Sequence, residues 1–173
     1  MATGRLTPRL VGLDSVQGAL DTIEQYFDNG WTDGLPVVPP TEIAVEAMIN
    51  ASGRDALEVL GIMPPRNGIV TIETVATNAV MAGCKPEYMP VVVSAVEALL
   101  DPLFDVHGLQ ATSDPAAPMV IVSGPVVESL GINHGIGLFG HGSRANATIG
   151  RSLRLLMVNS GGGHPDTGDK STM

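Results

Sequence analysis

Proline and glycine divide this sequence into short intervals, which limits the length of any helix or strand that it can form. Three of the last five residues in Trp31–Pro40 are proline, and a second turn at 64–68 begins with two more. Proline has no backbone N–H and clashes with a preceding helical turn, so the first segment is predicted to be an ordered, extended loop and the second a rigid turn. Five glycines between Gly131 and Gly142 mark a third loop. Regular structure must form in the intervals between these loops.

The intervals carry helix patterns with clear start and end signals. Residues that can cap a helix precede apolar residues at steps of three and four, and glycine often follows. Five helices are predicted, at 14–29 with Asp14 or Ser15 as cap, 41–51, 71–83, 87–100 and 143–157. The predicted inner faces include Val16, Leu20, Ile23 and Phe27 in the first helix, Ile43, Ala47 and Met48 in the second, Val75, Ala76, Ala79 and Val80 in the third, and Ala145, Ile149, Leu153, Leu156 and Met157 in the last.

Short strands are predicted beside these helices, at Leu57–Met63, Gly108–Ser113 and Met119–Ser123. The last of them is apolar at four successive positions, a pattern typical of a central strand covered on both faces. Together the elements predict an α/β or α+β fold with four or five helices on a small mixed sheet. The Gly- and Pro-rich segments are then its ordered loops.

The chain length fits one domain with a single core. We expect a flexible arm at 1–13, one globular domain at 14–160 and a Gly-rich tail at 161–173 that docks on a partner subunit. Aromatic residues make up only 3% of the sequence, so the core must be aliphatic.

Charge and cysteine content narrow the expected partners and compartment. Nine Lys and Arg against 18 Asp and Glu give a net charge of −9. This balance provides no basic surface for nucleic acid or an anionic membrane. A single cysteine allows no disulfide within the chain, and the sequence has neither a leader pattern nor a long apolar run. We therefore expect a cytoplasmic protein.

The segment from Gly131 to Asn146 is a candidate substrate-binding site. Its glycines, including Gly140 and Gly142, let the backbone approach a ligand, and Ser143 begins a helix whose first turn carries Arg144 and Asn146. Free N–H groups and the positive end of the helix dipole favour a carboxylate or phosphate there. The alternative is a glycine-rich turn without a ligand. The segment also matches a dinucleotide fingerprint, but the following strand and acidic residue that the motif requires are missing.

Further candidates for catalysis or binding lie near these loops. Cys84 falls between two predicted helices beside Lys85, where a lowered thiol pKa would make it a nucleophile or redox centre; the alternative is an inert packing residue. His134 and His141 could act as general acid or base, and their spacing does not match a metal site. The remaining candidates are polar residues close to rigid or apolar segments: Glu73 as a catalytic residue, Asn78 as a substrate-binding residue that needs a buried partner, and Asp33. The alternative for all three is helix capping or a turn, and it fits Asp33 better than Asn78.

Four long motifs carry a family resemblance. Trp31–Thr41, Gly61–Arg66, Thr77–Pro90 and Gly142–Arg154 resemble a poorly characterised bacterial family associated with UGSC proteins, small (seleno)proteins with a Sec/Cys-Gly-Ser-Cys motif. That family is distantly similar to the selenoprotein components of glycine and D-proline reductases. The resemblance covers roughly residues 26–163 and implies a small-molecule enzyme system with thiol or selenol chemistry.

The chain departs from this family in two ways. It has no UGSC motif, and longer relatives continue past the Gly-rich segment into a further domain. The resemblance therefore implies a second subunit that supplies the missing half, with its metal or its selenocysteine or thiol centre.

The expected function is that of one subunit of a heteromeric enzyme that cleaves or reduces a carbon–heteroatom bond in a carboxylate-bearing substrate, by lyase, hydrolase or reductase chemistry. Its site would form where the loops of Trp31, Arg66, Cys84 and Arg144 converge. The alternatives are a non-catalytic scaffold subunit that forms the interface for a catalytic partner, and a metal-dependent hydrolase.

Overall fold

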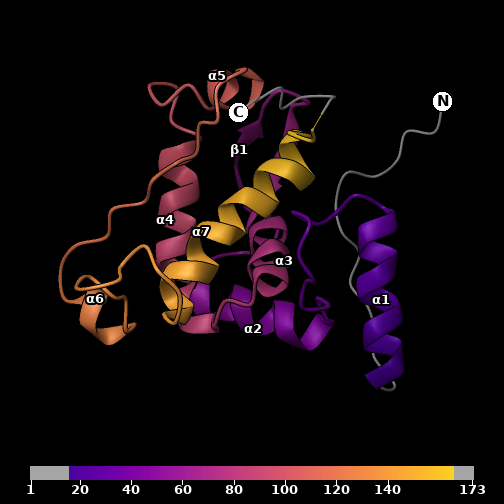
Figure 1. The fold of residues 1–173 in the computed structure, drawn as a ribbon, viewed down its shortest axis with the longest axis horizontal. Helices are drawn as coiled ribbons and strands as arrows, with labels where there is room; N and C mark the ends of the chain where they lie inside the picture. The colour runs from indigo at the N-terminus through magenta and orange to yellow at the C-terminus, as the bar shows by residue number, and fades with distance from the viewer. Residues whose placement is uncertain (1–15, 166–173) are drawn as a thin grey trace.

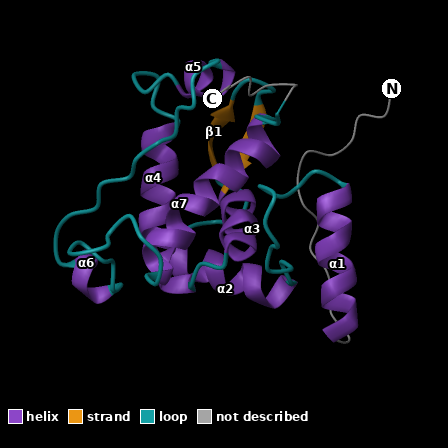
Figure 2. Cartoon of the chain, in the orientation of Figure 1, coloured by secondary structure: helices purple, strands orange, loops and turns teal. Residues whose placement is uncertain are grey.

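Helices form most of the fold, which a computed structural model describes for residues 16–165 (Figure 1, Figure 2). The predicted arm, the capping residues Asp14 and Ser15, and the tail beyond Pro165 lie outside this range. The described chain has seven α-helices and one two-stranded antiparallel sheet, so the fold is α+β as predicted. The helices are α1 Val16–Asp28, α2 Glu42–Ser52, α3 Ile72–Ala82, α4 Met89–Leu99, α5 Val106–Ala111, α6 Val126–Ser129 and α7 Arg144–Leu156. A 3-10 turn at Pro86–Tyr88 leads into α4, and a π-helical turn at Met157–Gly161 continues α7.

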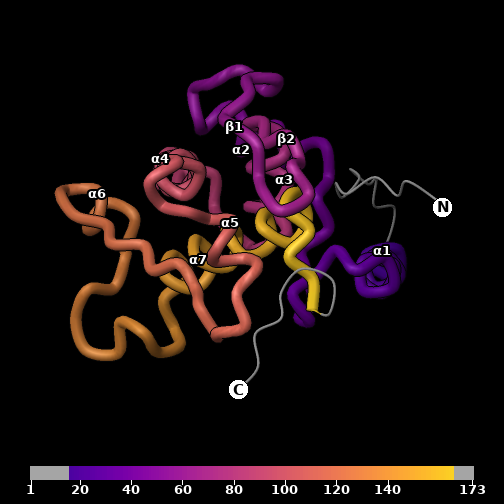
Figure 3. Tube along the Cα trace, turned by 90° about the horizontal axis from the view of Figure 1, so that it is seen from above, coloured from indigo at the N-terminus to yellow at the C-terminus, as the bar shows by residue number. Residues whose placement is uncertain are grey.

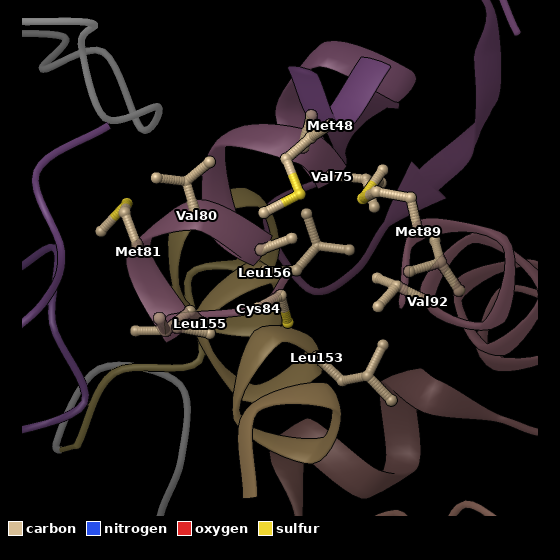
Figure 4. Packing of buried hydrophobic residues seen from close by; sticks show 14 of the residues in the cluster. Met48, Val75, Val80, Met81, Cys84, Met89, Val92, Leu153, Leu155 and Leu156 are labelled. Carbon is tan, nitrogen blue, oxygen red and sulfur yellow. The ribbon is translucent and has the colours of Figure 1, made fainter. Parts of the chain in front are cut away.

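Helix α3 occupies the centre of the molecule. Nine of its eleven residues are buried, and α2, α4 and α7 pack around it (Figure 1, Figure 4). Its start is capped internally: the Thr71 side chain accepts from the Thr74 N–H, and the Thr74 side chain accepts from the Thr71 N–H. Gly83 ends the helix with φ 88°, a conformation that favours glycine. Thr71, Thr74 and Gly83 thus satisfy part of each helix end locally, and the N–H groups of Ile72 and Glu73 donate to the carbonyls of Glu58 and Ala56.

The sheet is a hairpin at one end of this bundle. Strand β1, Val59–Met63, pairs with β2, Gly68–Thr71, in a register that places Ile62 opposite Ile69. Its turn packs against the end of α7, where the Arg66 N–H donates to the Gly161 carbonyl at 3.0 Å. The rigid turn predicted at 64–68 is therefore the turn of this hairpin, and it packs against the last turns of α7.

Most of the predicted elements are confirmed. The helices predicted at 41–51, 71–83, 87–100 and 143–157 are present with caps at Thr41, Thr71 and Ser143, and the first predicted strand is β1. The strand predicted at Gly108–Ser113 is wrong, because the Asp105 side chain accepts from the Gly108 N–H and starts the helix α5 there. The strand predicted at Met119–Ser123 is also wrong, because no described strand lies beside it to pair with.

Two predicted inner faces are wrong in part, although Ile23 and Phe27 of α1 are half-buried. Val16 and Leu20 are 81% and 52% exposed, because α1 lies apart from the other helices and only its end packs, through Tyr26 (Figure 1, Figure 3). In α2, Ile43 is 82% exposed and Ala47 is also exposed, since the helix turns Val45 and the correctly predicted Met48 toward α3.

The first residues of the predicted tail belong to the folded domain. Gly161, Gly162 and Gly163 are buried against their own chain and not available to a partner. A Cβ atom at Gly161 would lie 2.5 Å from the Pro64 carbonyl oxygen, and one at Gly162 would overlap the Arg66 side chain. The glycine run is therefore required by close packing under the hairpin turn. None of the helices within residues 16–165 has the length and apolar character that crossing a membrane requires.

This packing makes a testable prediction about two glycines of the same helical segment. Gly161→Ala should lower the free energy of unfolding by about 2 kcal/mol, because its new methyl group overlaps backbone that has little room to move. Gly150→Ala is the matched control: it lies on the exposed side of α7 with no atom within 4 Å of the added Cβ. It should raise stability by about 0.5–1 kcal/mol through helix propensity. Urea denaturation measures both values, and equal effects of the two substitutions would contradict the packing argument.

Candidate functional site

The loops that were predicted to converge are distributed along α7 instead of meeting at one place. The loop 131–142 and Ser143 lie at its first turn, whereas the hairpin turn and Gly161–Gly163 lie at its last turn (Figure 1). At about 1.5 Å per residue these ends are roughly 25 Å apart. The prediction that Arg66, Cys84 and Arg144 share one site is therefore wrong for Arg66, whereas Cys84 and Arg144 do lie close together near the start of α7. Two separate polar clusters take its place.

The cluster at the start of α7 holds the glycine loop in shape. The Asn146 amide donates to the carbonyls of Asn133, at 2.8 Å, and Leu138, at 3.1 Å, and its oxygen accepts from the Asn133 N–H at 2.8 Å. Ser143 caps the helix through the Asn146 N–H and donates to the Asn146 side-chain oxygen at 2.6 Å. Asn146 therefore organises the loop with all the polar atoms of its side chain.

The other candidates of this loop are either tied to the fold or exposed. Arg144 Nε donates to the Gly83 carbonyl at 2.9 Å and so joins the start of α7 to the end of α3. His134 and His141 are exposed, as are Gly140 and Gly142. The arrangement gives Arg144 a structural bond to the backbone, and it leaves the two histidines facing solvent.

Cys84 lies in the core (Figure 4). Its side chain is 5% exposed, and its Sγ donates to the Thr148 carbonyl at 3.3 Å. Burial raises the pKa of the Cys84 thiol, and hydrogen bonds with Thr148 and Ser152 and the charge of Arg144 offset this only in part. The lowered pKa considered from the sequence is therefore not found, and the side chain has the features of a packing residue.

The middle of α7 fixes the proline-rich loop. Arg151 makes two 2.9 Å hydrogen bonds with the Asp33 carboxylate and also donates to the carbonyls of Leu35 and Pro36. Burial favours a higher pKa for Asp33, but the hydrogen bonds and charge of Arg151 and the backbone N–H bonds outweigh it and hold the pKa below its usual value. Sequence reasoning assigned Asp33 to a turn and did not pair it with Arg151, because 118 residues separate them.

The second cluster forms where α7 ends. Asn78 donates to the Thr74 carbonyl at 2.8 Å, and Asn159 donates to the Asn78 oxygen at 2.7 Å and to the Trp31 carbonyl at 3.2 Å. The Trp31 ring meets the Tyr26 ring edge-on at 5.0 Å. Asn78 thus has the buried partner that its place on α3 requires, and that partner was not predicted.

Three buried polar atoms in this region have no hydrogen-bond partner among the described residues. They are Gln110 Oε1, Asn159 Oδ1 and Ser160 Oγ. The Gln110 amide also donates to the Pro64 carbonyl, directly beside Gly161. The only sequence signal for Asn159 and Ser160 was their position directly after the apolar run that ends α7.

Two titratable side chains lie close to this end of α7, Arg66 and His164. The Arg66 side chain crosses Gly162, and burial and the Arg66 charge lower the pKa of His164. Glu73, a predicted catalytic residue, is half-buried in the first turn of α3, where its N–H donates to the Ala56 carbonyl. No group of three or more His, Cys, Asp and Glu side chains within residues 16–165 could hold a metal.

An apolar groove lies along α4. Its volume is about 500 Å3, and it runs between α4 and the segment 118–123. The groove is lined by Pro90, Val91, Ser94, Ala95, Ala98, Leu99, Phe104, Pro118, Met119, Val120, Ile121, Val122, Ser123, Val126 and Leu153. No lining residue is charged, so the groove fits an apolar surface and offers no acid, base or nucleophile beyond two serine hydroxyls.

Comparisons with known proteins add no assignment. Neither protein-family models nor curated proteins match the sequence, and no solved structure matches the chain.

The contact between Asp33 and Arg151 predicts a pH-dependent stability. Asp33→Asn should lower the free energy of unfolding by about 2 kcal/mol at pH 7, because Arg151 loses its charged partner. The folded-state pKa of Asp33 lies below the unfolded value of about 4, so its contribution is complete above that value and is lost as pH falls through the folded pKa. The stability difference between the two proteins should therefore shrink below about pH 4.

Urea denaturation between pH 7 and pH 3 measures this difference. Asp114→Asn is the matched control, since Asp114 is exposed and its substitution should change stability by less than about 0.5 kcal/mol. A difference for Asp33→Asn that stays constant down to pH 3 would show that the ion pair does not supply it.

Proposed function

We propose that this chain is a non-catalytic subunit of a heteromeric enzyme and that its apolar groove holds the catalytic partner. The single observation that carries the proposal is the groove between α4 and segment 118–123, where Met119 is 68% and Ile121 is 80% exposed. A contiguous apolar surface without charged side chains is typical of a protein–protein interface.

The state of the candidate catalytic residues supports a structural role for this chain. Cys84 is buried with a raised pKa, and Asn146 and Arg144 bond to the backbone of their own chain. A nucleophile or a substrate clamp needs access to the substrate and a polar group free to bind it. Cys84 and Asn146 instead hold α7, α3 and the glycine loop together, whereas Arg144 contributes only its Nε and is otherwise exposed.

The family resemblance supplies the reaction in this proposal. The assembled enzyme would cleave or reduce a carbon–heteroatom bond in a carboxylate-bearing substrate, at a thiol, selenol or metal centre on the partner subunit. The present chain would position that subunit.

Native isolation tests the assembly. We expect a tag on this chain to recover a stoichiometric second subunit that carries a selenocysteine, a reactive thiol or a metal. Ile121→Asp should release that subunit, whereas Ile43→Asp, at an equally exposed position on α2, should retain it. Recovery of this chain alone from its native source, with a catalytic activity of its own, would overturn the proposal.

Thiol reactivity gives an independent test. Iodoacetamide should modify Cys84 at least about a hundredfold more slowly in the native protein than in urea, because reaction requires local opening. The matched control places an exposed thiol in the same chain: Ser113→Cys in a Cys84→Ala background should react at the solvent rate. Fast native alkylation of Cys84 would favour a catalytic role, as would loss of the complex's activity in Cys84→Ala with assembly intact.

A further inference from the structure

We propose that Met119–Ser123 is a β-strand addition site, which pairs with an extended apolar segment of the partner that carries Lys or Arg residues. This inference rests on the proposed function, since it names how the groove would hold the partner. Its support comes from the side chains, the backbone and the charge of the surrounding chain.

The side chains of the segment require cover on two faces. Met119, Val120, Ile121 and Val122 are successive apolar residues, the pattern of a strand inside a sheet. In the structure the exposure of these side chains alternates: Met119 and Ile121 are mostly exposed, whereas Val120 and Val122 are less exposed. The segment lines the groove against α4. One face therefore has a partner in α4, and the other face has none among the described residues.

The backbone of the segment is also unpaired. No hydrogen bond among the described residues involves a backbone group of Met119–Ser123. Figure 1 shows the segment as an open stretch between α5 and α6, away from the hairpin. Five extended residues span about 16 Å, the length of an ordinary strand. Unpaired donors and acceptors beside an apolar groove are the arrangement that accepts an added strand.

The charged residues of the sequence that flanks the segment indicate which kind of partner it would bind. Residues 86–143 contain six acidic residues and no Lys or Arg. Glu87 and Glu97 pair with Lys85 and Arg54, which lie outside this range. The other four, Asp101, Asp105, Asp114 and Glu128, are exposed, and none of them makes an ion pair with another described residue.

This charge favours a cationic segment over a second copy of the chain. Like charges placed opposite one another destabilise a strand pair, and complementary charges fix partner and register. Two copies of this chain would bring the same acidic surroundings together, each on a molecule of net charge −9. The geometry therefore points to an extended partner segment with apolar residues on the groove face and basic residues on the other.

A peptide experiment on the full chain tests strand addition directly. The probe is an amidated nonapeptide in which Lys alternates with Val and Ile, and its controls are the Glu counterpart and the same Lys peptide N-methylated at alternate residues. The N-methylated peptide keeps the charge and side chains but cannot form the ladder. We expect the Lys peptide to bind at least about tenfold tighter than either control and to slow amide exchange at Met119–Ser123 at least about tenfold. Equal binding of the N-methylated peptide would overturn the proposal.

A pair of substitutions at one position separates backbone from side chain. Ile121→Pro removes the N–H, and Ile121→Ala keeps it while shortening the exposed side chain. Neither should change the thermal midpoint of the free chain, because the N–H is unpaired and the side chain is 80% exposed. Ile121→Pro should weaken binding of the Lys peptide at least about threefold more than Ile121→Ala does, since it also removes a ladder hydrogen bond. An equal effect of both substitutions would contradict pairing through the backbone.

The native complex distinguishes this inference from the proposed function. If the second subunit is recovered but Met119–Ser123 exchanges as fast in the complex as in the free chain, strand addition is wrong and the proposed function stands. If no second subunit is recovered and sedimentation shows a dimer of this chain with the segment protected, the occupant is a second copy. That result overturns both the cationic partner and the proposed function.

Discussion

The burial of α3 on every side is the constraint on which the rest of the structure depends. A helix enclosed by α2, α4 and α7 can be approached closely only if its side chains are small, and Ala76, Ala79 and Ala82 meet that need. Its end groups have little access to water, so Thr71, Gly83 and the carbonyls of the segment 56–58 satisfy them. The positions of the other three helices follow from the surfaces that α3 offers.

The same burial explains why polar groups gather at the end of α7. Asn78 faces inward from α3, and an unpaired amide there would be costly, so Asn159 has to meet it. Asn159 also accommodates the Trp31 carbonyl, which ties the proline-rich loop to the same point. The glycines that follow then let the chain pass under Arg66 and Gln110. The Asn78 side chain, which faces inward from α3, is therefore central to the contacts among α3, the last turns of α7, the Trp31 loop and the hairpin turn.

Local signals predicted the elements well, whereas the site depended on contacts that local signals do not contain. Caps located the starts of α2, α3 and α7, and glycines located the ends of α2 and α3, because their physics acts within a few residues. The pairing of Asp33 with Arg151 and of Asn78 with Asn159 joins segments far apart in sequence, so the convergence predicted for the loops was wrong. Exposure of Val16 and Ile43 shows the same limit, since an apolar stripe indicates which residues can be covered but not whether a neighbour covers them.

The segment Met119–Ser123 shows what such a pattern does establish. Its apolar run predicted a strand covered on both faces, and the structure pairs it with no strand. The physical demand behind the prediction remains, because its backbone has no hydrogen-bond partner within residues 16–165 and Ile121 is largely exposed. A chain that places such a segment along a groove without charged side chains, with four exposed carboxylates in the flanking sequence, retains a surface that another polypeptide can complete. The failed strand prediction and the proposed interface therefore have one physical origin: an apolar segment with an unpaired backbone needs partners that the described residues do not supply.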